Sequence, residues 1–531
     1  MSARSPQTSS RGSSQGGARA RALAIGCAVG GAAAACSAIL DLKAPPAPID
    51  SGVTGLPLED DSGDAAGETD AGADSATPPV VCAPLAATAA DAAATTYSSF
   101  DLPANDGGLF PWEAFDTSLL ARHGAYTGAT FDGRYVYFAG RTTLVTRFDT
   151  TLTFEDATSW SQYDLASLGV PGGFAGAVFD NRYVYFVPYL VDTTTHPSVV
   201  SRFDTTGSFS SAASWASFDT STLPVDGGSV PGGFFGAGFD GRYVYFVPRN
   251  DGTPDGRIVR YDTTPLDGGS TAATDAGSAD GGNADAGDAA AAANAAFGDL
   301  ALWATFDLST INPGAIGFAG AVFDGTSLYL VPAVNDVLDA SVHSGTSGIV
   351  ARLKTASSFA ASSSWTTFDL TTVNGLAENF LGGAFDGRYV YFAPRGAGIV
   401  PRLDTRAAVF NATAAWSTYD LTQLFQADAA TPQYAGAAFD GRFVYLVPIG
   451  TSFYGLTRYD TLSTFTADCA WSTFDVSRVP MTDAGPPSYV GAVFDGQYLY
   501  LVPDGEFSIL RFDTKSPAAM PALPAFHGSF L

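Results

Sequence analysis

Histidine, cysteine and methionine are scarce in this 531-residue chain, which has four, four and three of them. The histidines are isolated from one another, and no Cys/His spacing typical of a zinc site is present. The chain also lacks a phosphate-binding loop, a dinucleotide fingerprint and a nucleophile elbow. We therefore expect no metal and no cofactor, and we single out no catalytic residue. The four histidines are His123, His196, His343 and His527.

Basic residues are also few, because 26 Lys and Arg stand against 53 Asp and Glu, for a formal charge of −27 at pH 7. A negative field of this kind repels nucleic acids and anionic membrane surfaces. We therefore exclude nucleic acid as a partner and expect contact with a membrane only through an anchor.

The apolar run from Ala22 to Ala35 follows four arginines and is too short to span a bilayer, as in a signal peptide. We interpret residues 1–35 as this signal peptide. The end of the run, Ala33-Ala34-Ala35-Cys36, resembles a bacterial lipoprotein cleavage box and implies a lipid on Cys36. Ordinary cleavage after Ala35 is the alternative. The resemblance implies an exported lipoprotein of the outer membrane or cell surface, with a periplasmic or secreted protein as the alternative.

Two stretches have almost no aromatic residues and cannot bury enough surface to order themselves. Residues 36–96 are rich in Ala, Pro, Gly and Asp, and we interpret them as a disordered tether. Residues 264–296 contain five aspartates and no basic residue, and we interpret them as a disordered insertion. Residues 516–531 form a C-terminal tail outside the repeats described next.

An eight-residue motif, Phe-Asp-Gly-Arg-Tyr-Val-Tyr-Phe at positions 131–138, organises the rest of the chain. An aromatic-x-Gly-Ala segment precedes it, and the Asp-Gly pair is typical of a tight hairpin turn. The Tyr-rich half reads as a second strand that ends at a proline. Segments of the types Arg-Phe-Asp-Thr and Trp-x-x-Phe-Asp follow as third and fourth strands. The motif recurs with small changes at Phe179, Phe239, Phe323, Phe385, Phe439 and Phe494.

All seven tryptophans open the fourth segment of a repeat. Use of the largest residue at one repeat position only predicts one core anchor for each repeat. The tryptophans are Trp112, Trp160, Trp215, Trp303, Trp365, Trp416 and Trp471.

Seven units of four short antiparallel strands, without helical periodicity between them, predict an all-β fold, a seven-bladed β-propeller over residues 97–515. The first clear element, at Trp112, is of the fourth type, and the last, at Arg511, is of the third type. We therefore expect the N-terminal strand to close the last blade. Tyr97 to Leu102 imitates the fourth segment and is an alternative closing strand.

The Tyr-rich second strand, the Tyr/Phe-Asp of the third and the Trp that opens the fourth resemble the kelch-type propeller repeat, over roughly residues 110–515. Kelch repeats end the second strand with Gly-Gly, whereas six copies here end in Val-Pro or Ala-Pro. The resemblance implies a binding platform more often than an enzyme.

Seven aromatics stand five positions before the repeat phenylalanine and are our candidates for ligand-binding residues at the mouth of the central channel. Packing between blades is the alternative, and we favour it because packing requires recurrence in every blade. The seven are Tyr126, Phe174, Phe234, Phe318, Phe380, Tyr434 and Tyr489.

An arginine opens every third segment, and an aspartate follows two residues later in six of the seven. We expect these residues to form Arg–carboxylate pairs between strands, with an anion-binding ring as the alternative. The hairpin aspartates are interpreted as turn residues. The arginines are Arg147, Arg202, Arg260, Arg352, Arg402, Arg458 and Arg511.

Cys82 and Cys469 are the cysteines that remain after removal of the leader and Cys36. In an oxidising compartment they could form a disulfide, and two free thiols are the alternative. Taken together, these features favour a monomeric binding or scaffold module of the cell envelope, with a protein or glycan partner on the inter-blade loop face. The alternative is a carbohydrate-active hydrolase or lyase with its active site at the channel mouth.

Overall fold

The computed structural model describes twelve stretches of the chain. The predicted signal peptide, tether and C-terminal tail, and most of the 264–296 insertion, lie outside them. None of the described helices is long and apolar enough to cross a membrane. The stretches are 112–122, 124–191, 195–225, 231–250, 253–264, 294–333, 345–425, 430–450, 453–479, 481, 488–505 and 508–514.

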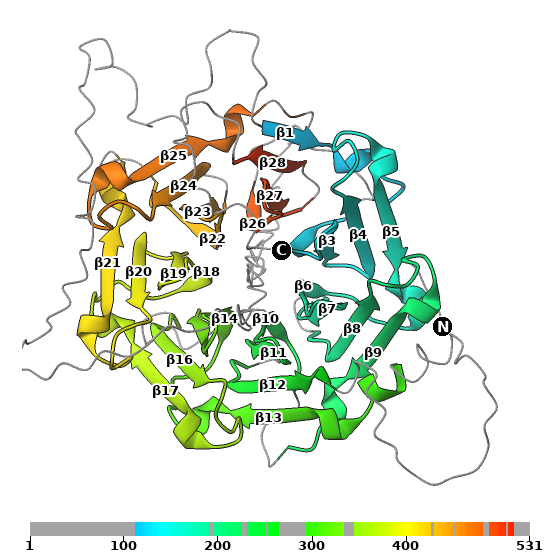
Figure 1. The fold of residues 1–531 in the computed structure, drawn as a ribbon, viewed down its shortest axis with the longest axis horizontal. Helices are drawn as coiled ribbons and strands as arrows, with labels where there is room; N and C mark the ends of the chain where they lie inside the picture. Colours follow the sequence, from blue (N-terminus) through cyan, green and yellow to red (C-terminus); the bar gives the residue numbers. More distant parts are fainter. Residues whose placement is uncertain are drawn as a thin grey trace, which may run out of the picture.

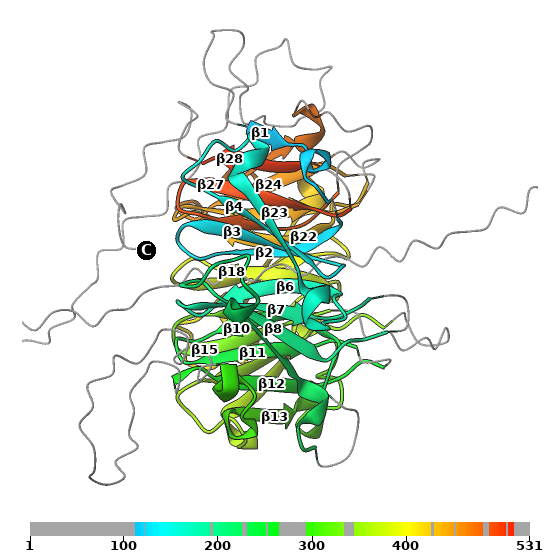
Figure 2. The same ribbon diagram turned by 90° about the vertical axis from the view of Figure 1, so that its right-hand side faces the viewer.

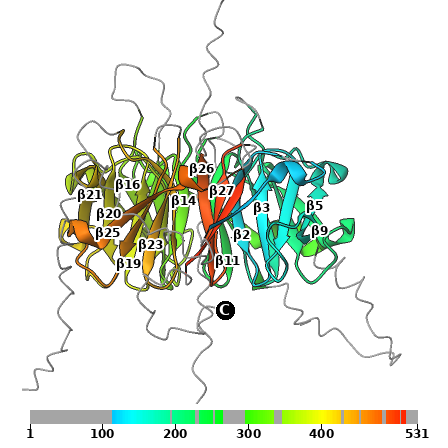
Figure 3. The ribbon, with the colours of Figure 1, turned by 90° about the horizontal axis from the view of Figure 1, so that it is seen from above.

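Seven sheets, each of four antiparallel strands, form a closed ring, so the predicted seven-bladed β-propeller is confirmed. Figure 1 looks along the ring axis: the first strand of each blade lines the centre and the fourth lies at the rim. The first strands contact one another in chain order, and that of the seventh blade returns to that of the first. Figures 2 and 3 show the ring from its edge.

The strands of equivalent position have nearly equal lengths in all blades. The first strands are β2 (Tyr126–Phe131), β6 (Phe174–Phe179), β10 (Phe234–Phe239), β14 (Phe318–Phe323), β18 (Phe380–Phe385), β22 (Tyr434–Phe439) and β26 (Tyr489–Phe494). The second strands are β3 (Tyr135–Gly140), β7 (Tyr183–Pro188), β11 (Tyr243–Pro248), β15 (Ser327–Pro332), β19 (Tyr389–Pro394), β23 (Phe443–Pro448) and β27 (Tyr498–Pro503). The third strands are β4 (Leu144–Asp149), β8 (Val199–Asp204), β12 (Arg257–Asp262), β16 (Ile349–Lys354), β20 (Ile399–Asp404), β24 (Gly455–Asp460) and β28 (Ile509–Asp513). The fourth strands are β5 (Trp160–Asp164), β9 (Trp215–Asp219), β13 (Trp303–Asp307), β17 (Trp365–Asp369), β21 (Trp416–Asp420), β25 (Trp471–Asp475) and β1 (Trp112–Phe115).

Short 3-10 helices flank the fourth strands. The aspartate at the end of each fourth strand caps the helix that follows, as Asp164 does by accepting a hydrogen bond from the Ala166 backbone N–H. The helices before the fourth strands are η2 (Ala157–Ser159), η4 (Ala212–Ser214), η7 (Leu300–Leu302), η9 (Ser362–Ser364), η11 (Thr413–Ala415) and η13 (Asp468–Ala470). The helices after them are η1 (Thr117–Leu119), η3 (Leu165–Leu168), η5 (Thr220–Thr222), η8 (Leu308–Thr310), η10 (Leu370–Thr372), η12 (Leu421–Leu424) and η14 (Val476–Arg478).

The hairpin between the first and second strands is held by its aspartate. In the first blade, Asp132 accepts hydrogen bonds from the backbone N–H groups of Arg134 and Tyr135 and from the Tyr137 hydroxyl, at 2.6 to 2.8 Å. Gly133 supplies the positive φ of +99° that the turn requires. The same three bonds recur at Asp180, Asp240, Asp324, Asp386, Asp440 and Asp495, so their role as turn residues is confirmed.

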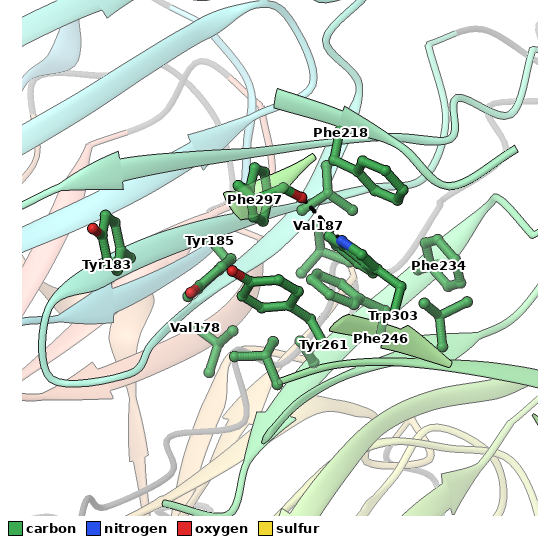
Figure 4. Packing of buried hydrophobic residues seen from close by; sticks show 14 of the residues in the cluster. Val178, Tyr183, Tyr185, Val187, Phe218, Phe234, Phe246, Tyr261, Phe297 and Trp303 are labelled. Atoms are coloured by element: carbon green, nitrogen blue, oxygen red, sulfur yellow. Dashed lines mark hydrogen bonds between the residues drawn. The ribbon is translucent and has the colours of Figure 1, made fainter. Parts of the chain in front are cut away.

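The tryptophans are the predicted core anchors, since each is at most 7% exposed. Six of them donate the indole N–H to the carbonyl of a phenylalanine six residues earlier, at 3.0 Å. Each also stacks on an aromatic from the fourth strand of the preceding blade, as Trp303 does on Phe218 with ring centroids 4.2 Å apart. Figure 4 shows this arrangement, with Trp303 between Phe218 and Phe246 and its bond to Phe297 dashed.

The N-terminal strand β1 lies on the outer edge of the seventh blade, whose strand order is β1-β28-β27-β26. Trp112 stands opposite Phe512, and Glu113 stands opposite Arg511. Arg511 donates from one nitrogen to both carboxylate oxygens of Glu113, at 2.8 and 2.9 Å. Residues from the two ends of the described chain therefore share one blade.

Candidate functional site

The seven aromatics predicted at the channel mouth are not accessible to a ligand, because each is at most 1% exposed. They lie inside the blade cores; Phe174, for example, packs with Phe186 and Trp215. This outcome corrects their assignment as ligand-binding residues and supports the packing alternative. The residues concerned are Tyr126, Phe174, Phe234, Phe318, Phe380, Tyr434 and Tyr489.

A β-bulge follows each of these aromatics, because in every blade the pairing of the first and second strands shifts directly after it. Successive residues of a strand point to opposite faces of the sheet. The residues directly after three of the aromatics, Ala175, Phe235 and Leu381, share one buried cluster contributed by several blades around the axis.

Arg511 forms the predicted Arg–carboxylate pair between strands, with Glu113 of β1, whereas Arg147, Arg202 and Arg402 lie between aromatic rings. The Arg147 guanidinium lies 4.1 Å from the ring centre of Tyr135 in its own blade and 4.1 Å from that of Phe209 in the next. Arg202 and Arg402 repeat this geometry. Guanidinium groups between two rings stabilise the contact between blades. Only 1% of Arg202 is exposed, so Arg202 cannot belong to the anion-binding ring that was the alternative.

The third-strand aspartates instead pair with the arginines of the hairpins. Arg134 contacts Asp149 at 2.7 Å, and Arg182 contacts Asp204 at 3.0 Å. Burial works to raise the pKa of Asp149, but hydrogen bonds from Arg134 and Thr151 outweigh it and hold the pKa at about 2. The same balance lowers the pKa of Asp204. Equivalent pairs occur at Arg242–Asp262, Arg388–Asp404 and Arg442–Asp460.

Because the pKa values of Asp149 and Asp204 are lowered in the folded protein, we expect the protein to lose stability in acid. A group whose pKa is lowered by folding contributes stability above its unfolded pKa and loses it as the pH falls through the folded value. We expect Arg182→Met to lower the free energy of unfolding by about 1 kcal/mol at pH 7, since the pair is partly solvent-screened. Urea denaturation should show this difference fading as the pH falls below about 4. If the difference in the free energy of unfolding stayed constant down to pH 2, the effect of the substitution would come from packing and not from the ion pair.

One repeat position lies at the axis and differs from blade to blade. It is the residue directly after the second strand, and its backbone N–H donates to the carbonyl of the residue directly before the first strand in all seven blades. This bond places the residue beside the start of the first strand, which is the innermost strand of the blade. The loops between second and third strands and the loops between blades form this face of the ring, which we call the loop face. We call these seven residues the axial ring: Arg141, Tyr189, Arg249, Ala333, Arg395, Ile449 and Asp504.

The axial ring rests on an apolar base. Tyr189, Ala333 and Ile449 belong to the buried cluster around the axis, together with Phe235. The Arg249 guanidinium lies 4.2 Å from the ring centre of Phe235 and 6.0 Å from that of Tyr189, and only 5% of Arg249 is exposed. Its Nη1 is buried and has no hydrogen-bond partner among the described residues.

The remaining charges of the axial ring interact across blades. Arg141, in the first blade, donates to Asp504 in the seventh at 2.6 Å. Burial raises the pKa of Asp504, while the positive charges of Arg141 and Arg395 act against that rise. Arg395 belongs to the fifth blade, so charged groups from three blades influence one another at the loop face.

Few other sequence candidates fall within the described residues. His196 lies beside Tyr189, with ring centres 6.1 Å apart, whereas His123, His343 and His527 lie outside the described residues. No group of three or more potential metal ligands occurs in the described part of the chain. Cys469 is disulfide-bonded. Cys36 and Cys82 lie outside the described residues, so lipidation of Cys36 and the pairing of Cys82 with Cys469 stay predictions.

No protein-family model and no curated protein matches the chain. Among solved structures, it is similar to a catalytically inactive virginiamycin B lyase from Staphylococcus aureus with quinupristin, at 13% identity and a TM-score of 0.44, over 76% of this chain and 98% of that one. It is also similar to YCF48 bound to D1 peptide, at 13% identity and a TM-score of 0.42, over 78% and 97%. At this identity neither likeness extends to a ligand or an activity.

Proposed function

We propose that this protein is an exported, lipid-anchored β-propeller that serves as a binding or scaffold module of the cell envelope. Its partner, a protein or a glycan, contacts the loop face. The observation that supports the binding function is the axial ring, where Arg141, Arg249, Arg395 and Asp504 break a symmetry that the packing positions keep. A residue that packs the repeat recurs in every blade, whereas a residue that binds a ligand is free to differ.

A crosslinking experiment tests the loop face as the binding surface. Photo-crosslinkers placed at Arg395, on the loop face, and at Lys354, on the opposite hairpin face, should give different results with envelope proteins and glycans. We expect adducts from position 395 and none from position 354. Equal labelling from both faces would contradict the proposal.

The anchor is tested separately. We expect Cys36→Ser to move the protein from the membrane fraction to the soluble fraction, because a lipidated cysteine is then lost. Cys27→Ser is the matched control, since Cys27 lies inside the expected leader and would be removed with it. Intact mass spectrometry of the mature N-terminus measures the result. An unmodified Ser37 or Cys36 N-terminus in the wild type would overturn the anchor.

The alternative, a carbohydrate-active hydrolase or lyase, is favoured by Asp504. Burial raises the pKa of Asp504, and a carboxyl group of raised pKa is suited to transfer protons. Release of new chain ends from acidic polysaccharides by the wild type, and its loss in Asp504→Asn, would support this alternative over simple binding.

A further inference from the structure

The chemistry of the axial ring indicates which ligand it would take. The chain as a whole is strongly acidic, yet the axial ring has three arginines and one aspartate. Arginines at one repeat position of the loop face are suited to an anionic group, because the rest of this acidic chain repels anions.

Arg249 is a member of the axial ring with a buried donor that has no partner among the described residues. Its guanidinium lies over the Phe235 ring, with Cζ 4.2 Å from the ring centre. Nη1 is buried without a partner among the described residues. A buried charged donor without an acceptor destabilises the folded protein. Such a donor is expected where a ligand supplies the acceptor.

The other charged members of the axial ring affect which anion would bind there. Arg141 and Arg395 are partly exposed, and Asp504, whose side chain is 18% exposed, accepts a hydrogen bond from Arg141. A carboxylate inside a ring of arginines would weaken the binding of a bare anion. It favours a ligand that carries hydroxyl donors next to its negative group.

The apolar base limits how deeply the ligand enters. The cluster that contains Phe235, Leu381 and Ile449 is at most 4% exposed at these residues, so the axis below the ring is filled by side chains. The ligand therefore contacts the ring from the loop face, with a single residue or chain end.

We infer that the axial ring binds the carboxylate of an acidic sugar, such as a uronic acid residue of a glycan. Arg249 and Arg395 receive the carboxylate, and Asp504 accepts hydrogen bonds from sugar hydroxyls. The inference rests on the proposed binding function and names the ligand class of the same site.

Calorimetry with the mature full-length protein tests this inference, with trigalacturonate as the probe. Its methyl ester removes the charge but keeps the hydroxyls, and a tripeptide with a free carboxylate keeps the charge but removes the hydroxyls. We expect trigalacturonate to bind at least tenfold more tightly than either, as charged hydrogen bonds are worth about that factor or more. Equal binding of the ester, tighter binding of the peptide or no binding of the sugar would overturn the inference.

Variants locate the binding. Arg249→Met should weaken binding roughly 10- to 100-fold, through loss of a charged donor, without lowering the melting temperature, because it removes a buried donor that has no partner. Arg395→Gln, at a partly exposed position, is a second variant with an expected loss of about tenfold. Lys354→Gln removes one charge from the hairpin face and should leave binding unchanged. Unchanged binding in both arginine variants would overturn the assignment.

Failure of this inference and failure of the proposed function give different results. If only the sugar class is wrong, position 395 still crosslinks to an envelope partner while trigalacturonate does not bind. If the binding function is wrong, position 395 gives no adduct with any envelope component.

Discussion

Trp303→Ala is expected to lower the free energy of unfolding by about 3 to 5 kcal/mol, which is the cost of truncating a buried aromatic side chain to alanine. Trp303 is 6% exposed and donates its indole N–H to the Phe297 carbonyl at 3.0 Å. It contacts Phe218 of the preceding blade and Tyr261 of its own, so the cavity would open at a blade interface.

Two further variants separate the contributions of this residue. Trp303→Phe keeps most of the ring but loses the indole donor, and the buried Phe297 carbonyl is then without that bond, for an expected cost of about 1 to 2 kcal/mol. Leu300→Ala is the matched control, because Leu300 lies three residues earlier in η7 and is 49% exposed. Its cost should be below about 0.5 kcal/mol. Denaturant titration followed by far-ultraviolet circular dichroism measures all three. A Trp303→Ala cost no larger than that of Leu300→Ala would contradict the anchor role.

Most of the fold could be predicted from the repeats in the sequence. The Asp-Gly pairs, the prolines that end the second strands and the tryptophans that open the fourth strands correspond to the turns, strand ends and core anchors of the structure. They could be predicted because each is a local requirement that every blade repeats. A turn such as Asp132-Gly133 depends on its own few residues, and no distant contact changes it.

Pairing choices could not be predicted in the same way. Arg134 and Arg147 both recur, and the repeat does not say which of them meets Asp149. The strands place Tyr135 opposite Asp149 and Tyr137 opposite Arg147, so Arg134 at the turn reaches the carboxylate, while Arg147 lies over the Tyr135 ring. That outcome depends on the register and on the next blade, which supplies Phe209.

The candidate site was missed for a related reason. We considered the aromatics, but the residue after each of them lies on the opposite face of the first strand, and several of these residues pack together around the axis. The axial ring itself falls directly after the second-strand prolines, where the copies disagree. That disagreement was the available signal: among well-kept repeats, the position that changes from Arg141 to Tyr189 to Arg249 has no common packing role.

Loss of the closing strand is expected to have the other large effect. β1 holds the seventh blade by its pairing with β28, and its aromatics also join two interfaces. Trp112 stacks on Phe474 of the sixth blade at 5.1 Å, and Phe115 stacks on Trp160 of the first at 4.2 Å. The double variant Trp112→Ala/Phe115→Ala should therefore cost about 6 to 10 kcal/mol, if truncations at two separate interfaces add. That amount is comparable with the whole stability of a typical domain.

Hydrogen exchange shows where this loss acts. With β1 detached, the backbone amides of β28 that face it should exchange much faster, while those of β16, the equivalent strand of the fourth blade on the far side of the ring, should change little. Glu113→Gln is the milder variant: it keeps both aromatic contacts and weakens only the bond to Arg511, for an expected cost of about 1 to 2 kcal/mol. Protection of β28 that survives the double variant would mean that another segment occupies the edge. Residues 97–102, which imitate the fourth segment, are the candidate, and their deletion in the double variant should then abolish the protection.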